Sequence, residues 1–345
     1  MIDIIDPHIH LWDPRTTPRI VSPLVKRFGW SPWLLEKLTM LLMPKSTIDF
    51  VGKAEHVLHS HLPELYHRDT GKYNVAGYVH IQAGWTCKDP TDAADETRWV
   101  AGLSDPPLAI VGEAHLHDLA NLDDVLDAHQ AASPIVKGVR DMMAWHESSS
   151  VMDFNVTGDV LKRDDFREGY ARLGARGLTF DAWAYSHQLP DLIRLIEDVP
   201  ETKVVLDHIG TPIGIAGPHG GLGTTADQRT SIKDQWYANL SRLAQVDHVR
   251  VKLSGLLMPV LGFGFEQRDT PASLAEVVDG IGPHVEFALK EFGVDRCMFA
   301  SNFPMDKVST TFETLYDAYF QIVQNYSDVD QQKLFRDNAL TFYGV

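Results

Sequence analysis

Two histidines near the start of the chain have the spacing of a paired chemical site. His8 and His10 lie in the stretch DPHIH at 6–10, directly after the apolar residues Ile4 and Ile5, which predict a short buried strand. Side chains two positions apart in a strand share one face, so both imidazoles point the same way. Such a pair can hold a divalent metal ion or exchange protons near neutral pH. The alternative is two surface histidines with no shared task.

An arginine and a third histidine end two later predicted strands. Arg140 ends the stretch KGVR, and its guanidinium suits a substrate carboxylate or a carbonyl oxygen that gathers negative charge. The alternative is a salt bridge to the neighbouring Asp141. His208 follows Asp207 after the apolar residues 204–206. A single histidine at a strand end is more often structural than catalytic, but a position shared with the first pair favours a functional role.

Further polar and aromatic side chains follow the fourth and fifth predicted strands and are candidates for substrate binding. They are Trp145, His146, Trp183, Tyr185 and His187. Aromatic side chains at a pocket are typical of a flat or ring-shaped ligand, although each of them could equally pack in the core. We therefore expect a small-molecule substrate that is cyclic and anionic.

Short apolar or β-branched runs alternate with longer helical patterns along the chain. Eight strands are predicted, one at the start of the chain and the others at 75–81, 108–114, 135–140, 178–183, 203–207, 249–253 and 297–301. Strict alternation of strand and helix means parallel pairing, and eight such units close into a (β/α)8 barrel. With 345 residues, we expect a single α/β domain over 1–345, with the chemistry at the C-terminal ends of the strands.

Three insertions interrupt this pattern, after strands one, four and six. They cover 11–74, 141–177 and 211–231. The first contains an apolar segment at 33–43, which predicts an amphipathic helix packed on the core, and a second, histidine-rich helix that we expect to be solvated. The histidines of that helix are His56, His59, His61 and His67. The third insertion is rich in glycine without a phosphate-binding spacing, which predicts a flexible loop over the barrel mouth.

Charge and cysteine content exclude several classes of partner. The formal net charge is −16, and no basic stripe offsets it, which argues against nucleic acid and anionic membrane surfaces. The segment 33–43 is too short to span a bilayer and carries Glu36 and Lys37, but it is a candidate contact in a homo-oligomer. The two cysteines, Cys87 and Cys297, exclude a disulfide scaffold. The low cysteine content and the lack of a leader before the first strand predict a cytoplasmic location.

Six ordered stretches at or near the predicted strand ends carry a family resemblance. They read DPHIHLWD at 6–13, KGVRDMMAWH at 137–146, FDAWAYSHQLPDL at 180–192, VVLDHIGTP at 204–212, VKLSGL at 251–256 and MFASNFPMDK at 298–307. Together they resemble the amidohydrolase-2 family, and within it the sugar-lactone and 2-pyrone-4,6-dicarboxylate lactonase group. The resemblance implies a (β/α)8 barrel that hydrolyses a lactone or related ester-like bond. It also implies one divalent metal ion, zinc or manganese, held by His8 and His10, or none.

The end of the eighth strand departs from that family. The family pattern there is SDWP, whose aspartate activates the attacking water, whereas this chain reads SNFP at 301–304. The amide of Asn302 cannot accept a proton as a base, and it is a weaker metal ligand than a carboxylate. Asp306 is the nearest carboxylate in the same loop. A histidine of the site is the second candidate for the general base.

The combined prediction is a hydrolase that opens a lactone or related ester with activated water, with Arg140 or a metal ion polarising the carbonyl group. The predicted catalytic residues are His8, His10, His208, Asn302 and Asp306. One alternative is a metal-dependent, non-oxidative decarboxylase of an aromatic acid, which needs a firmly held metal and the strand-eight aspartate. The other is a non-catalytic ligand-binding barrel, which the loss of the acid at 302 supports and the retention of three histidines with Arg140 opposes.

Overall fold

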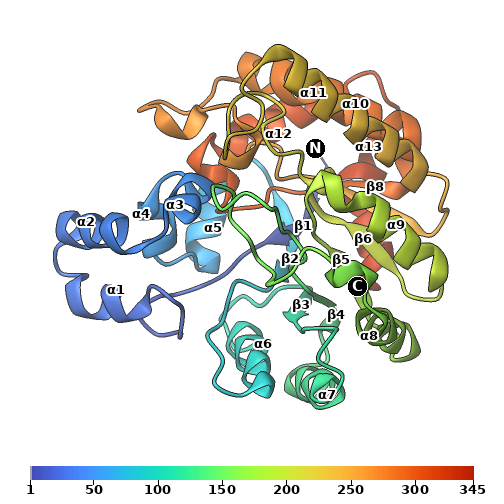
Figure 1. Ribbon diagram of the computed structural model, residues 1–345. Coiled ribbons are helices and arrows are strands. Elements are labelled where there is room, and N and C mark those ends of the chain that lie inside the picture. Colours follow the sequence, from blue (N-terminus) through green and yellow to red (C-terminus); the bar gives the residue numbers. More distant parts are fainter. Residues whose placement is uncertain (1) are drawn as a thin grey trace.

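Eight parallel strands form a barrel at the centre of the molecule. The structure is a computed structural model that describes residues 2–345 (Figure 1). Its strands are β1 (Ile4–Ile9), β2 (Val75–Ile81), β3 (Ala109–Glu113), β4 (Val136–Arg140), β5 (Thr179–Ala182), β6 (Val204–Leu206), β7 (Val249–Leu253) and β8 (Cys297–Phe299). Each strand pairs in parallel with the next in sequence. The predicted (β/α)8 barrel is confirmed.

Backbone contacts between the segment after β8 and the end of β1 close the barrel. The amide of Asn302 donates to the carbonyl oxygen of His8 at 2.9 Å, and the amide of His10 donates to the carbonyl oxygen of Phe303 at 2.9 Å. Ile9 and Phe303 form a parallel bridge. The backbone therefore holds positions 8, 10 and 302 next to one another.

Helices surround the barrel (Figure 1). In chain order they are α6 (Ala93–Ala101), α7 (Leu122–Ala132), α8 (Asp164–Ala175), α9 (Leu189–Asp198), α10 (Ala226–Leu243), α11 (Leu274–Phe292), α12 (Phe312–Ile322), α13 (Asp328–Gln332) and α14 (Asn338–Tyr343). In α9 a proline stands in the first turn, and Leu192, Ile193 and Ile196 are buried at helical spacing. This one-sided pattern places the apolar face of the helix on the barrel.

Charged side chains lie near the centre of the barrel interior. Strand residues alternate between the hydrophobic core under the helices and the barrel axis. In β7, Val251 and Leu253 join the main hydrophobic core together with buried helix residues. Lys252 stands between them, is fully buried, and contacts carboxylates of β5 and of the segment after β6. Successive side chains of a strand point to opposite faces, so the lysine faces the barrel axis.

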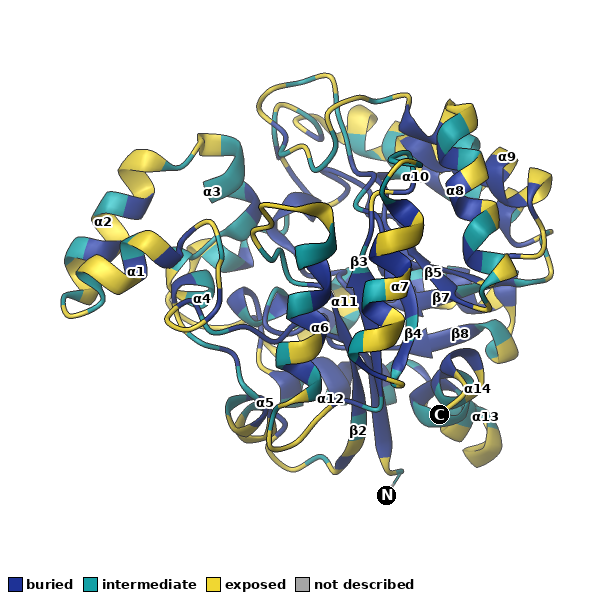
Figure 2. Ribbon diagram, turned by 90° about the horizontal axis from the view of Figure 1, so that it is seen from below, coloured by how far each residue is buried: buried dark blue, intermediate teal, exposed yellow. Residues whose placement is uncertain are grey.

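The insertion after β1 contains five helices, and most of it projects to one side of the barrel (Figures 1 and 2). They are α1 (Ser22–Phe28), α2 (Pro32–Leu42), α3 (Lys45–Val51), α4 (Ala54–Leu58) and α5 (Pro63–Asp69). The helix predicted at 33–43 is α2. The expectation that it packs on the core was wrong, because Trp33, Leu41 and Leu42 are exposed while Leu35 is buried in a small separate cluster.

The predicted histidine-rich helix is instead two short helices, α4 and α5. His59 and His61 lie between them, and His61 pairs with Trp12 in a small antiparallel bridge. His61 is buried, and its Nδ1 atom lies 2.7 Å from the carbonyl oxygen of His10. The expectation of a solvated helix therefore fails at His61, which supports the strand that carries the first histidine pair.

The insertions after β4 and β6 form where they were predicted. Residues 141–163 precede α8, and residues 211–225 precede α10. The sequence did not reveal a further irregular segment, 254–273, between β7 and α11. No helix among residues 2–345 is long and apolar enough to cross a membrane.

Candidate active site

A bulge in β1 brings the first histidine pair to the barrel mouth. Asp6 pairs with Tyr78 and Ile9 pairs with His80, so β1 has one more residue than β2 over this interval. Bulges of this kind turn side chains and are frequent beside active sites. The rings of His8 and His10 lie 5.0 Å apart between centroids, as their spacing predicted.

His10 presents an unprotonated nitrogen to the cavity at the strand ends. Its Nδ1 atom lies 2.9 Å from the carbonyl oxygen of Ile81. A carbonyl oxygen only accepts, so Nδ1 carries the proton and Nε2 carries the free lone pair. Burial holds the pKa of His10 well below its usual value, which keeps the ring neutral. His10 lines the cavity, so it is placed to take a proton from a bound water molecule.

His8 lies behind His10, outside the cavity lining, and has the opposite tautomer. Its Nδ1 atom is 3.1 Å from Nζ of Lys252, and an ammonium group only donates, so Nδ1 accepts and Nε2 carries the proton. Lys252 also contacts Asp181 directly and lies 3.1 Å from Oδ1 of Asp207. The hydroxyl of Tyr343 donates to Asp181 at 2.8 Å. His8 is therefore the outer member of a buried charged network and does not itself line the cavity.

A strained turn after β6 positions His208. His208 and Ile209 have φ values of 56° and 51°, in the left-handed region that non-glycine residues rarely adopt. The indole of Trp236 holds the turn by donating to the carbonyl oxygen of Ile209 at 2.7 Å. Nδ1 of His208 lies 2.9 Å from the hydroxyl of Ser254. The ring lies 4.4 Å from that of His8 between centroids and lines the cavity, so the three predicted histidines do meet.

Arg140 also reaches the cavity, but its partners differ from the predicted ones. Its Nη2 atom donates to the carbonyl oxygen of Gln82 at 2.8 Å, and Nη1 lies 3.8 Å from Oδ2 of Asp207. The alternative salt bridge to Asp141 does not form. That carboxylate accepts from the amide of Leu116 and faces His115 instead. The guanidinium lies 6.0 Å from the ring of Trp183. It is thus held rigidly, with its charge matched by Asp207.

Asn302 and Asp306 occupy different positions relative to the cavity. Asn302 lines it, with a left-handed backbone (φ 56°) that asparagine tolerates. The Nδ2 atom of Asn302 donates to Oδ1 of Asp306 at 3.1 Å, which leaves Oδ1 of Asn302 without a partner among the described residues. Asp306 is fully buried behind it and is not part of the cavity wall. Asp306 therefore does not face the cavity directly, and its role as the general base stays a prediction.

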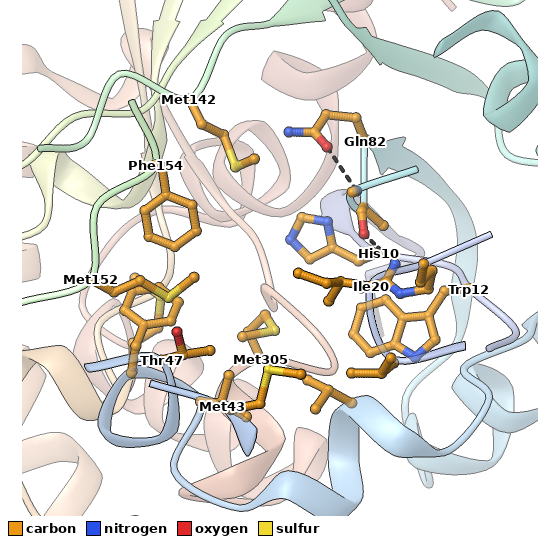
Figure 3. A pocket seen from close by; sticks show the side chains of 18 of the residues that line it. His10, Trp12, Ile20, Met43, Thr47, Gln82, Met142, Met152, Phe154 and Met305 are labelled. Atoms are coloured by element: carbon orange, nitrogen blue, oxygen red, sulfur yellow. Dashed lines mark hydrogen bonds between the residues drawn. The ribbon is translucent and has the colours of Figure 1, made fainter. Parts of the chain in front are cut away.

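A cavity of about 420 Å³ opens above these groups (Figure 3). His10, Arg140, His208 and Asn302 line it and are called the polar floor below. Trp12, Gln82 and Trp183 adjoin these residues in the cavity lining. In Figure 3, His10 and Gln82 lie on one side of the pocket, and Met142, Met152 and Phe154 lie on the other. The floor is built from strand ends, as expected for a barrel of this kind.

Four of the predicted substrate-binding residues are not part of this cavity wall. They are Trp145, His146, Tyr185 and His187. Tyr185 is buried and donates from its hydroxyl to the carbonyl oxygen of Met152 at 2.7 Å. His146 and His187 pack edge to face against each other, with centroids 5.2 Å apart. These side chains support the loops after β4 and β5, and of the five predicted residues Trp183 alone lines the cavity.

Sequence reasoning missed the charged network under the histidines. Lys252 and Asp181 are fully buried at the centre of the barrel, and Asp207 was noted only as the neighbour of His208. A usable signal was present. Lys252 and Asp181 are each a charged residue between apolar ones within a predicted strand. Such a residue faces the barrel axis when its neighbours face the helices.

A divalent metal ion does not fit this arrangement of charges. Possible ligand atoms of His8, Asp207 and His208 lie within 4.8 Å of one another, as in a metal site, but His10 is not in that group. The Lys252 ammonium already faces His8 and Asp207 at 3.1 Å each, and Arg140 lies close to Asp207. A further two positive charges would leave the buried site with a large uncompensated charge. The carboxylate that could offset them is replaced by Asn302.

The sequence is similar to one protein family and to relatives that include a lactonase. The amidohydrolase family profile matches residues 5–345. The uncharacterized protein y4mH of Sinorhizobium fredii is 31% identical over 347 residues, which cover 100% of this chain and 99% of that protein. The L-fucono-1,5-lactonase of Burkholderia multivorans is 28% identical over 165 residues, which cover 48% of this chain and 49% of that protein.

Solved structures share the fold at low sequence identity. A zinc-bound amidohydrolase from Burkholderia multivorans superposes with a TM-score of 0.71 at 19% identity, covering 99% of each chain. A 2-pyrone-4,6-dicarboxylic acid hydrolase-like protein from Pseudomonas putida superposes with a TM-score of 0.60 at 16% identity, covering 100% of this chain and 98% of that one. Both likenesses extend over the whole barrel.

Proposed function

Because the chain belongs to the amidohydrolase family of hydrolases, we propose that it opens a lactone or related carboxylic ester with a water molecule that His10 activates. The observation that carries this proposal is the tautomer of His10. Its Nδ1–H is held by the carbonyl oxygen of Ile81 at 2.9 Å, so Nε2 is a neutral base on the polar floor. The name of the L-fucono-1,5-lactonase relative agrees with the same bond type.

The reaction follows from the donors and acceptors of the floor. A water molecule bound at Nε2 of His10 gives its proton to His10 as its oxygen adds to the carbonyl carbon. Arg140 and His208 lie beside His10 and stabilise the negative charge that develops on the carbonyl oxygen. The ring C–O bond then breaks, and His10 returns the proton to the departing alkoxide. The products are a carboxylate and an alcohol in one opened chain.

Asn302 takes a different role from the aspartate of the family pattern. Its amide cannot remove a proton, so His10 acts as the base, and Asn302 contributes a neutral polar side chain to the floor. Asp306 accepts from Nδ2 of Asn302, which fixes the orientation of the amide. The departure at 302 is thus compatible with hydrolysis.

The test is ring opening of simple lactones by the purified chain, followed as acid release at constant pH. His10→Ala should lower kcat by about 100- to 10,000-fold, the usual contribution of a general base. His187→Ala is the matched control, since this histidine is exposed and outside the cavity. Full activity of His10→Ala would overturn the proposal. Release of carbon dioxide from hydroxybenzoates without any lactone opening would favour the decarboxylase instead.

A further inference from the structure

The walls of the cavity have a different character from its floor. Above the strand ends they are formed by apolar side chains from the insertion after β1 and from the loops after β4 and β7. The residues that carry the argument are Ile20, Met43, Ile48, Phe50, Met152 and Phe154, and they are called the apolar wall below. Phe50 and Phe154 pack edge to face with centroids 5.1 Å apart, and Phe154 also packs on Trp183 at 4.6 Å.

Polar groups among these walls are largely occupied by other parts of the protein. The hydroxyl of Thr39 donates to the carbonyl oxygen of Leu35 at 2.9 Å. The indole N–H of Trp12 donates to the carbonyl oxygen of His59 at 2.8 Å. The guanidinium of Arg19 lies over the Trp12 ring at 4.5 Å and donates to a backbone carbonyl. Thr39 and Trp12 therefore have no donor left for hydroxyl groups of a ligand, whereas Arg19 keeps N–H groups without a partner.

We propose that the substrate is a lactone or ester with an apolar alkyl or aryl substituent, which the apolar wall binds while the polar floor holds the reacting ester. This inference rests on the proposed hydrolysis and names its substrate class. A carbonyl group at His10 leaves the remainder of the molecule toward the opposite side of the pocket, where Met152 and Phe154 lie (Figure 3). Burial of apolar surface then drives binding.

The same wall disfavours a sugar lactone. A sugar lactone carries hydroxyl groups around its ring, and each loses its bonds to water when it enters an apolar cavity. Such a loss without a new partner opposes binding. Above the floor, the polar groups left to compensate are few beside the apolar side chains. They are the hydroxyls of Thr47 and Thr86, the amide of Gln82 and the guanidinium of Arg19.

The methionines of the cavity lining also suit a substituent of variable length. Met43, Met142, Met152, Met258 and Met305 all line the cavity, and methionine side chains adapt their shape to different apolar partners. Ile20 lines the cavity although 77% of its surface is exposed. It therefore stands at the rim, where a longer chain leaves the cavity.

The experiment is a comparison of kcat/KM for δ-valerolactone, δ-octalactone, δ-decalactone and L-fucono-1,5-lactone with the full chain. We expect kcat/KM to rise about fourfold per added methylene while the alkyl chain is still entering the cavity. The sugar lactone should be the poorest substrate of the series. A flat dependence on chain length, or a preference for the sugar lactone, would overturn the inference while leaving the hydrolysis proposal intact. Failure to open any of the four would instead overturn the proposed function.

A pair of variants at exposed positions separates the wall from general hydrophobicity. Ile20→Asp places a charge at the rim and should lower the ratio of kcat/KM for δ-decalactone over δ-valerolactone at least tenfold. Leu41→Asp is the matched control, because Leu41 is 79% exposed on α2 and does not line the cavity. An equal ratio in Ile20→Asp and the unmodified chain would contradict the role of the apolar wall.

Discussion

The Nζ atom of Lys252 lies 3.1 Å from Nδ1 of His8 in the closed interior of the barrel, and both side chains are fully buried. The lysine gives the site a permanent positive charge, with Asp181 and Asp207 as its counter-ions. It also fixes the His8 tautomer. The barrel thus contains a balanced set of two cations, with Arg140 as the second, and two carboxylates beneath three neutral histidines.

Replacing Lys252 should disrupt both the site and the fold. Lys252→Met keeps the length of the side chain but leaves two buried carboxylates without their cation. Removing one partner of a buried ion pair costs about 3–5 kcal/mol, so the free energy of unfolding in urea should fall by that amount. Lys290→Met, at an exposed lysine of α11, is the control and should be nearly neutral. Equal stabilities of the two variants would contradict the network.

Gly255 should be essential for the placement of His208. A Cβ atom built at Gly255 would lie 2.4 Å from Cγ of His208, and the φ angle of Gly255 is +63°. Gly255→Ala must therefore displace the imidazole, and a shift of about 1 Å in a reacting group can cost about a hundredfold in rate. We expect that loss in kcat for lactone opening.

Gly177→Ala is the control for the backbone part of this effect. Gly177 has a similar φ of +69°, but nothing lies within 4 Å of its Cβ position. Both variants should lose about 1–2 kcal/mol of stability through the left-handed backbone. Only Gly255→Ala should also lose activity. A parallel loss of activity in both variants would show that the contact with His208 is unimportant.

Restoring the family aspartate at position 302 should not raise kcat. Asn302→Asp places a second carboxylate against Asp306 and removes the amide that donates to it at 3.1 Å. With His10 as the base, the new acid adds repulsion and no needed proton acceptor, so kcat should fall or stay unchanged. Asn302→Ala, which lacks any acceptor, measures the contribution of the amide. A gain of tenfold or more in Asn302→Asp would show that an acid at 302 is the better base.

Activity should be independent of added or bound divalent metal. The site already pairs two cations with two carboxylates around Asp207, so zinc or manganese has no uncompensated negative charge to bind. Elemental analysis should find well below one ion per chain, and dialysis against a chelator should leave kcat unchanged. Loss of activity on chelation with recovery on adding zinc would contradict the charge argument.

Much of this site follows from the sequence because the barrel geometry is simple. His8, His10, Arg140 and His208 stand at strand ends, and parallel strands in a barrel bring their C-terminal ends to one mouth. Sequence spacing therefore predicted their meeting. It could not predict that Arg140 faces Asp207 instead of Asp141, because that pair forms across the barrel between residues far apart in the chain.

The cavity wall was harder to foresee for a physical reason. The helix α2 was expected to pack on the core, since an apolar segment usually buries its surface. In the structure it belongs to an arm beside the barrel, and Met43 at its end lines the cavity while Leu41 is exposed. Likewise, Trp145 and Tyr185 are aromatic residues near the mouth, but loop packing turns them away from the cavity.

The pH dependence of stability should report on Asp306. Burial raises the pKa of this carboxyl group from its usual 3.8 to about 7. An acid with a raised pKa in the folded state opposes folding once the unfolded chain ionises. Its neutral form is therefore fully compatible with folding below about pH 4, and stability is lost progressively as the pH rises to about 7. That difference in pKa corresponds to at most about 4 kcal/mol.

Asp306→Asn tests this dependence directly. The substituted side chain keeps an oxygen that can accept from Asn302 but cannot ionise, so the variant should match the unmodified chain near pH 4 and exceed its stability near pH 8. Urea unfolding at the two pH values measures the difference. Asp317→Asn is the control, because Asp317 is bound by Lys72 and Tyr73, which lower its pKa. That substitution should instead lower stability near pH 8. The same pH profile in Asp306→Asn and in the unmodified chain would show that the pKa of Asp306 is not raised in the folded state.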